Sequence, residues 1–152
     1  MSHRAARNFT WLVFAATLAS CGGGEPASSP VAAPVAGPSA LESVDIAPGA
    51  GAAITAGQKA VVQYTGWLYE SSAADKKGQQ FDSSQNSGMP FSFNLGTGQV
   101  IKGWDRGVLG MKVGGRRRLT IPADLAYGDS GAGGVIPPGA TLVFDIELVA
   151  IE

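Results

Sequence analysis

One stretch decides the fold, and it reads Gln99-Val100-Ile101-Lys102-Gly103-Trp104-Asp105-Arg106-Gly107-Val108-Leu109-Gly110-Met111. Its apolar side chains recur at the spacing of an α-helix and share one face: Ile101, Trp104, Val108 and Met111. Gly103 and Gly107, four residues apart, leave a second face on which a neighbouring element can approach the backbone closely. The pattern therefore predicts a short helix with an apolar face.

The start of this helix predicts a binding site. The N–H groups of a first turn, here those near Val100 and Ile101, have no acceptors within the helix. Beside the indole of Trp104 they would offer a small ligand an apolar floor and hydrogen-bond donors. A second interpretation stays open, in which Trp104 is only a core residue, because apolar residues at helical spacing usually serve packing.

Around this helix the sequence alternates as β-strands do. Between Ala60 and Tyr69 one face carries Val62, Tyr64, Gly66 and Leu68, and further on Phe91, Phe93 and Leu95 share a face. In the last strand Leu142, Phe144, Ile146 and Leu148 point inward, and Thr141, Asp145 and Glu147 point outward. The polar segment 71–80 and the glycine- and proline-rich segment 122–139 are predicted as loops. The fold class is α+β: a mainly antiparallel sheet with one short helix against a face.

The N-terminus is predicted to be a targeting segment. Arg4 and Arg7 precede an apolar run, residues 9–18, that has the length of a signal-peptide core. The tetrapeptide Leu18-Ala19-Ser20-Cys21 resembles the lipobox of bacterial lipoproteins, in which the cysteine is lipidated and becomes the first residue. The alternative is a chance cysteine in a signal peptide that is cleaved elsewhere.

We therefore expect residues 1–20 to be a lipoprotein signal peptide. Residues 21–43, a lipidated Cys21 followed by a Pro/Gly/Ala/Ser tether, would join a membrane to a domain of residues 44–152. The expected location is the bacterial cell envelope. Gly22 after the cysteine favours the outer membrane, facing the periplasm, and the cell surface is the second choice.

Several function classes lack the residues they need. The chain has one histidine, His3, and one cysteine, both in the N-terminal segment, so the domain offers no histidine base and no thiol nucleophile. No phosphate-binding loop or metal-ligand cluster is visible, and we expect no metal and no cofactor. The run Arg116-Arg117-Arg118 is better explained by a solvated sheet edge or by structural ion pairs than by nucleic acid, since its members alternate faces and the net charge is −1.

Six motifs, in order, carry a resemblance to a known family. They are Val-Gln-Tyr-Thr-Gly-Trp-Leu (62–68), Phe-Asp-Ser-Ser (81–84), Pro-Phe-Ser-Phe-Asn-Leu-Gly (90–96), Val-Ile-Lys-Gly-Trp-Asp (100–105), Ala-Tyr-Gly (126–128) and Ile-Pro-Pro-Gly-Ala-Thr-Leu-Val-Phe-Asp-Ile-Glu-Leu (136–148). Together they closely resemble the FKBP family of peptidyl-prolyl cis/trans isomerases, over residues 44–152. The resemblance implies a bent sheet wrapped on the short helix, with a shallow apolar pocket between them.

The resemblance also implies a site. Trp104 would form the pocket floor, and the walls would be Tyr64, Phe81, Phe91, Val100, Ile101, Ile136 and Phe144. The catalytic residues would be Asp82, Ile101 through its N–H, and Tyr127 through its hydroxyl. For Asp82 a structural role, accepting hydrogen bonds from Tyr64 or a backbone turn, stays equally open.

This chemistry explains why acids, bases and nucleophiles are missing, since rotation about an X-Pro bond changes no covalent bond. The implied partners are proline-containing polypeptides, macrolides such as rapamycin and tacrolimus, and the membrane through the lipid anchor. A monomer is expected. The rim departs from eukaryotic members at three places: the insertion in 71–80, Ser87 where arginine is often found, and Ala132 where histidine is common. A non-catalytic module that binds proline segments, or a chaperone, is the alternative.

Overall fold

The strands and helix lie in a computed structural model that describes residues 37–152. The strands are β1 (Glu42–Ala47), β2 (Lys59–Tyr69), β3 (Lys77–Ser83), β4 (Phe91–Asn94), β5 (Arg116–Ile121) and β6 (Leu142–Ile151). One α-helix, α1 (Lys102–Gly107), and three short 3-10 turns, η1 (Ser84–Asn86), η2 (Ala123–Leu125) and η3 (Gly128–Ser130), complete the described part. The alternating runs thus become strands, as predicted.

All pairings in the sheet are antiparallel, in the order β1-β5-β6-β2-β3. The long strand β2 pairs with β6 along one edge, and along its other edge it pairs with two strands, β4 and β3. β4 pairs with residues 59–62 and β3 with residues 65–69 of β2. The strand that runs along this edge is therefore interrupted between Ser83 and Phe91, where η1 lies. This interruption, the break between β3 and β4, places the ends of β3 and β4 beside the middle of β2.

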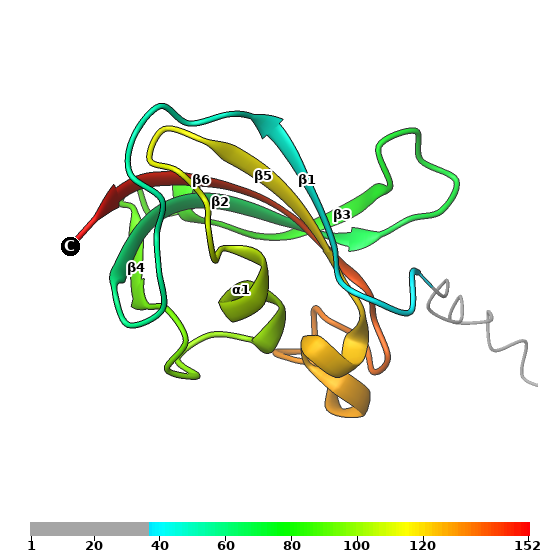
Figure 1. The fold of residues 1–152 in the computed structure, drawn as a ribbon. Helices are drawn as coiled ribbons and strands as arrows, with labels where there is room; N and C mark the ends of the chain where they lie inside the picture. The colour runs from blue at the N-terminus through cyan, green and yellow to red at the C-terminus, as the bar shows by residue number, and fades with distance from the viewer. Residues whose placement is uncertain (1–36) are drawn as a thin grey trace, which may run out of the picture. The chain divides into compact units, whose positions relative to one another are not determined.

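Helix α1 packs against β5 on the inner side of the curved sheet (Figure 1). A methyl group on Gly103 would lie 2.4 Å from Ile121 Cγ2, and one on Gly107 would lie 2.5 Å from Leu119 Cδ1. These distances are far below van der Waals contact, so the two glycines allow the close approach that their spacing predicted. The predicted α+β class, an antiparallel sheet with one short helix, is confirmed.

The helix is shorter than its apolar pattern. Ile101 precedes its first residue, Val108 follows its last, and Met111 lies beyond it, although Val108 and Met111 are buried as predicted. The helix ends because the next groups bond elsewhere: Gly110 N–H donates to Ile54 O at 3.0 Å, and Ile54 N–H donates to Met111 O at 2.8 Å. Gly110 has φ +79°, a conformation that only glycine adopts readily.

Two sequence expectations near the sheet are wrong. The segment 71–80 is not a loop to its end, since β3 begins at Lys77, where Lys77 pairs with Tyr69 and its ammonium lies 4.0 Å from the Trp67 ring centroid. Thr141 does not point to solvent but is 7% exposed, because the backbone at Gly37 lies against its side chain. Both outcomes depend on residues distant in sequence.

The arginine run forms ion pairs across the sheet. Each arginine forms a salt bridge with the acidic residue opposite it on the neighbouring strand: Arg116 with Glu147, Arg117 with Asp45, and Arg118 with Asp145. Arg117 also donates to the carbonyls of Gly107 and Leu109 at 2.9 and 3.2 Å, where it caps the end of α1. The predicted structural role of this run is confirmed.

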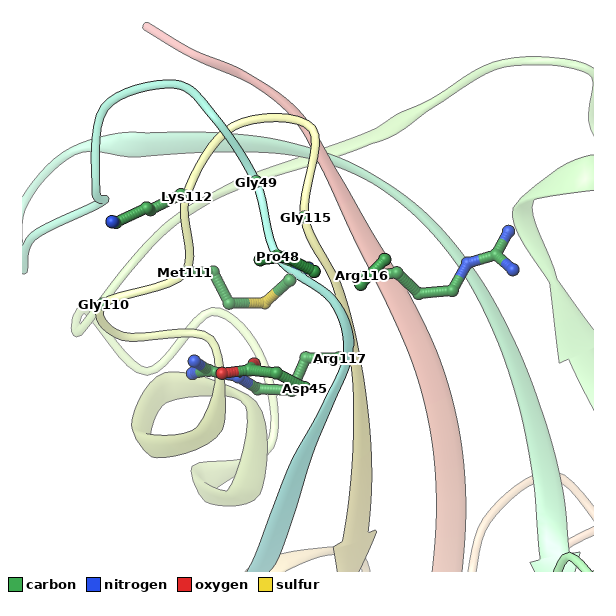
Figure 2. Close-up of a pocket in the computed structure, with 10 residues that line it drawn as sticks. Asp45, Pro48, Gly49, Gly110, Met111, Lys112, Gly115, Arg116 and Arg117 are labelled. Carbon is green, nitrogen blue, oxygen red and sulfur yellow. The ribbon is translucent and has the colours of Figure 1, made fainter.

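Figure 2 shows the surroundings of Arg117, where the side chains of Arg117 and Asp45 lie side by side above the end of α1. A cavity of about 160 Å³ lies here between β1 and the turn that follows the helix. The hydrogen bond from Arg117 lowers the pKa of Asp45. The guanidinium of Arg117 already donates hydrogen bonds to Asp45 and to two backbone carbonyls. The cavity is therefore part of the structural contact between β1, β5 and α1.

Asp145 is the centre of a second charge cluster, on the outer side of β6. Lys77 Nζ lies 2.6 Å from its Oδ2, and Arg118 donates to both carboxylate oxygens at 2.7 and 3.1 Å. Burial by itself would raise the pKa of Asp145, but the hydrogen bonds from Arg118 and Lys77 lower it below its usual value. The ionised form therefore stabilises the fold.

This cluster predicts a pH-dependent stability. A carboxyl whose pKa is lower in the folded state stabilises the protein above its unfolded pKa, about 3.9, and this contribution is lost as the pH falls through the folded value. Asp145→Asn should therefore destabilise the protein at pH 7, and the difference from the wild type should shrink below about pH 4. Urea unfolding at pH 7, 5 and 3 measures both curves. Asp124→Asn, at an exposed position, is the control, and parallel curves for Asp145→Asn and wild type would refute the assignment.

Within residues 37–152, no helix is long and apolar enough to cross a membrane. The predicted signal peptide and Cys21 lie outside the described residues. So does most of the predicted tether, although β1 begins at Glu42, just before the predicted domain boundary at Val44.

Candidate functional site

The sheet and the start of α1 enclose an apolar pocket of about 380 Å³. Its walls come from segments that are far apart in the sequence: Tyr64 on β2, Phe81 and Asp82 on β3, Phe91 on β4, Gln99, Val100 and Ile101 before α1, Trp104 on α1, Tyr127 between η2 and η3, and Phe144 on β6. All but one of the residues predicted for the site therefore line one pocket.

The exception is Ile136. It is 6% exposed, packs in the core and does not line this pocket. The reason is local: Ile136 and Ala132 exchange two backbone hydrogen bonds of 3.0 Å, and the tight turn that they close holds the Ile136 side chain in the core. Sequence reasoning also missed Gln99, whose Oε1 accepts from Asn94 N–H at 2.8 Å. Its position just before Val100 was the available signal.

Trp104 is the floor of the pocket and also a core residue. It is 4% exposed, and its ring centroid lies 5.0 Å from that of Tyr64, 5.2 Å from Phe144 and 6.0 Å from Phe91, each with an edge-to-face orientation. Rings at these distances and angles attract one another beyond simple burial. Trp104 is therefore both a core residue and the floor of the pocket, because its packing against the other rings holds the walls in place.

The indole N–H of Trp104 has no hydrogen-bond partner in the described part of the chain. The atom is buried, so it does not reach a ligand without a movement of the floor. An unpaired buried donor costs free energy, and such groups are rare in folded proteins.

Gly66 allows two walls of the pocket to meet. A methyl group at this position of β2 would lie 2.7 Å from both Phe81 and Phe144, whose ring centroids are 5.5 Å apart. Nearby, Ser84 is buried and joins the break between β3 and β4 to β2, because its Oγ accepts from Tyr64 N–H at 2.9 Å. These contacts hold Phe81, Phe91 and Asp82 around Tyr64.

Asp82 makes both of the structural contacts expected of it. Its Oδ2 accepts a hydrogen bond from the Tyr64 hydroxyl at 2.7 Å, and its Oδ1 accepts from Ser83 N–H at 2.8 Å. Burial, followed by the hydrogen bond to Asp82, raises the pKa of Tyr64. The phenol therefore stays protonated, and Asp82 lies exposed at the rim of the pocket.

Two kinds of hydrogen-bond donor remain available at the pocket. Among residues 37–152, the backbone N–H groups of Val100 and Ile101 and the hydroxyl of Tyr127 have no acceptor. Burial, and then the charge of Asp82, raises the pKa of Tyr127, so its hydroxyl keeps its proton. A bond from Gly139 N–H to Gly128 O, at 2.9 Å, closes the loop that carries Tyr127.

The pocket suits the binding of a peptide and rotation about one of its bonds better than it suits the cleavage of a bond. Its walls are mostly aromatic and aliphatic, its free donors point to a carbonyl-containing ligand, and its only charged lining residue is Asp82. In the described part, no three histidine, cysteine or acidic residues come together as metal ligands. The arrangement can exclude water from a peptide group and hold its oxygen.

Comparison with known proteins agrees with this geometry. A family model described as FKBP-type peptidyl-prolyl cis-trans isomerase matches residues 51–149. The chain is 50% identical over 107 residues to an FK506-binding protein of Neisseria meningitidis serogroup B, covering 70% of this chain and 92% of that protein. It is 56% identical over 96 residues to the peptidyl-prolyl cis-trans isomerase FPR2 of Saccharomyces cerevisiae, covering 63% and 67%.

The fold has solved counterparts. The crystal structure of AtFKBP13 matches with a TM-score of 0.64 at 41% identity, covering 77% of this chain and 97% of that one. The resemblance carried by the six motifs therefore extends to the family model, the relatives and the fold. The chain belongs to the family of FKBP-type peptidyl-prolyl cis-trans isomerases.

Proposed function

We propose that this enzyme speeds X-Pro rotation in exported proteins by taking the peptide bond out of water in its aromatic pocket. Rotation faces a barrier of about 18–20 kcal/mol because it breaks the amide resonance. The planar amide is more charge-separated than the twisted one, so an apolar site disfavours the planar ground state. The observation that carries the proposal is the pocket of about 380 Å³ whose floor is Trp104 and whose walls are mostly apolar.

The free donors supply the second part of the mechanism. In our proposal the Ile101 N–H and the Tyr127 hydroxyl bind carbonyl oxygens of the peptide, and hold the rotating group more tightly when it is twisted. Shortening a relaxation of about 100 s to about 1 ms needs a total of about 7 kcal/mol from these effects. Asp82 orients Tyr64 and keeps the wall in place through the bond of 2.7 Å.

An exchange assay tests both parts. The full chain, purified in mild detergent, is expected to accelerate cis/trans exchange of an Ala-Leu-Pro-Phe peptide, followed by NMR with detergent alone as the control. Tyr127→Phe should lower kcat/KM about five- to ten-fold, the loss of one hydrogen bond of about 1–1.4 kcal/mol. Rapamycin should quench the exchange if macrolides occupy the pocket. Tight peptide binding without exchange would instead support the non-catalytic binding or chaperone module.

We further propose that the enzyme acts in a bacterial cell envelope, held by a lipid on Cys21 at the outer membrane and facing the periplasm. The Leu18-Ala19-Ser20-Cys21 sequence after an apolar run supports this. Slow prolyl isomerisation limits the folding of many proteins, and exported chains fold in that compartment. The anchored enzyme is proposed to work as a monomer.

The anchor has a direct test. Cys21→Ser should abolish the incorporation of labelled fatty acid into the protein, because the thiol of residue 21 is the proposed site of lipidation. Isomerase activity per folded molecule should stay unchanged, since residue 21 lies outside the domain. Ser20→Ala, which keeps a small residue before the cysteine, is the control. A Cys21→Ser protein that still takes up the labelled fatty acid, or a wild-type protein that takes up none, would refute the lipid anchor.

A further inference from the structure

A second cavity, of about 420 Å³, adjoins the pocket and shares Tyr64, Asp82 and Phe91 with it. The rest of its wall comes from residues 83–90, at η1 and the turn into β4. We refer to it as the flanking cavity. We propose that the flanking cavity is a substrate subsite that favours lysine or arginine beside the proline, an inference that rests on the proposed isomerase function.

Continuity of the two cavities places a substrate residue there. A proline over Trp104 has neighbours whose Cα atoms lie about 3.8 Å away across a trans bond and about 2.9 Å away across a cis bond. Because Tyr64 and Phe91 line both cavities, the side chain of one neighbour extends along them into the flanking cavity. Its size, about 420 Å³, accommodates a long side chain.

The charge of the flanking cavity decides which side chain fits. Asp82 is the only charged residue in its wall, and no lysine or arginine of residues 37–152 lies within 4.0 Å of its carboxylate. Its two hydrogen bonds come from neutral donors, Tyr64 and Ser83. An ionised carboxylate accepts about four hydrogen bonds, so it retains capacity for an ammonium or guanidinium group.

The apolar part of the wall suits the stem of the same side chain. Met89 is 68% exposed and Phe91 is 40% exposed, with Pro90 between them. Lysine and arginine cover apolar surface with their methylene groups while the charged head stays near water or a carboxylate. Leucine would cover the apolar part without pairing Asp82, and glutamate would be repelled by it.

Exchange rates on two peptide series test the proposal. Blocked Ala-Xaa-Pro-Phe and Ala-Leu-Pro-Xaa peptides, with Xaa as lysine, norleucine or glutamate, cover the residue before and the residue after the proline. In one series kcat/KM for lysine should exceed that for norleucine about three-fold, the range of an exposed ion pair, with glutamate lowest. The lysine preference should approach one in 1 M salt, where charges are screened within about 3 Å.

Variants separate this inference from the proposed function. Ser87→Lys adds a cation to the flanking cavity and should abolish the lysine preference, whereas Ser87→Ala should retain it and norleucine turnover should continue in both. In Asp82→Asn the lysine-to-norleucine ratio should fall to one, whatever the loss in rate. Equal rates for lysine and norleucine in both series, or a preference that survives Asp82→Asn, would overturn the subsite. Failure to accelerate the norleucine peptides would instead refute the isomerase function.

Discussion

Trp104→Ala is expected to lower the free energy of unfolding by about 3–5 kcal/mol, the range for a buried tryptophan. The indole contacts three other aromatic rings of the pocket at centroid distances of 5.0–6.0 Å, so its removal leaves a void between the walls. In the fraction that stays folded, kcat/KM should fall at least ten-fold, about 1.4 kcal/mol, because water enters the site and the proline ring loses its floor. Urea unfolding and NMR exchange at low temperature measure the two effects separately.

Two other variants make this result specific. Trp67→Ala removes a half-buried tryptophan whose ring lies under Lys77, away from the pocket, and should reduce stability while kcat/KM stays near that of the wild type. Trp104→Phe keeps an aromatic floor and also removes the unpaired indole N–H, so its loss of stability should be smaller than that of Trp104→Ala. Unchanged turnover in folded Trp104→Ala would show that the floor does not contribute to catalysis.

Gly103→Val is expected to cost about 3 kcal/mol of stability and to disturb the pocket at the same time. A Cβ atom at position 103 would lie 2.4 Å from Ile121 Cγ2, and this neighbour is fully buried and β-branched, so it cannot rotate away. Helix α1 must then move off β5 and take Trp104 with it. Urea unfolding measures the destabilisation, and a blue or red shift of the Trp104 fluorescence, read in a Trp67→Phe and Trp11→Phe background, reports the displacement.

A matched control and a double mutant identify the cause. Lys102→Val adds the same side chain to an exposed position of α1 and should change stability by only about 0.5 kcal/mol. Ile121→Ala by itself leaves a cavity, but combined with Gly103→Val it makes room for the new methyl groups. The two changes together should therefore cost at least about 1 kcal/mol less than their sum. Strict additivity would show that the close approach of α1 to β5 is not the reason for Gly103.

The sequence alone determined those features that depend on neighbours along the chain. Alternation predicted β2, β4 and β6, because successive side chains of a strand point to opposite faces. Helical spacing predicted that Trp104 and Val108 are buried and that Gly103 faces a close neighbour, as α1 shows. The residues of the site came from motif resemblance, and all but Ile136 line one pocket.

Only the tertiary structure decided the features that depend on contacts between distant segments. The end of α1 is set by hydrogen bonds to Ile54, and the burial of Thr141 by the chain at Gly37. The start of β3 at Lys77 depends on its pairing with Tyr69 and its contact with Trp67. The flanking cavity and the position of Asp82 in it follow from the break between β3 and β4. Periodicity carries no information on such pairings, because register and loop path are chosen by the total packing of the sheet rather than by any local run of residues.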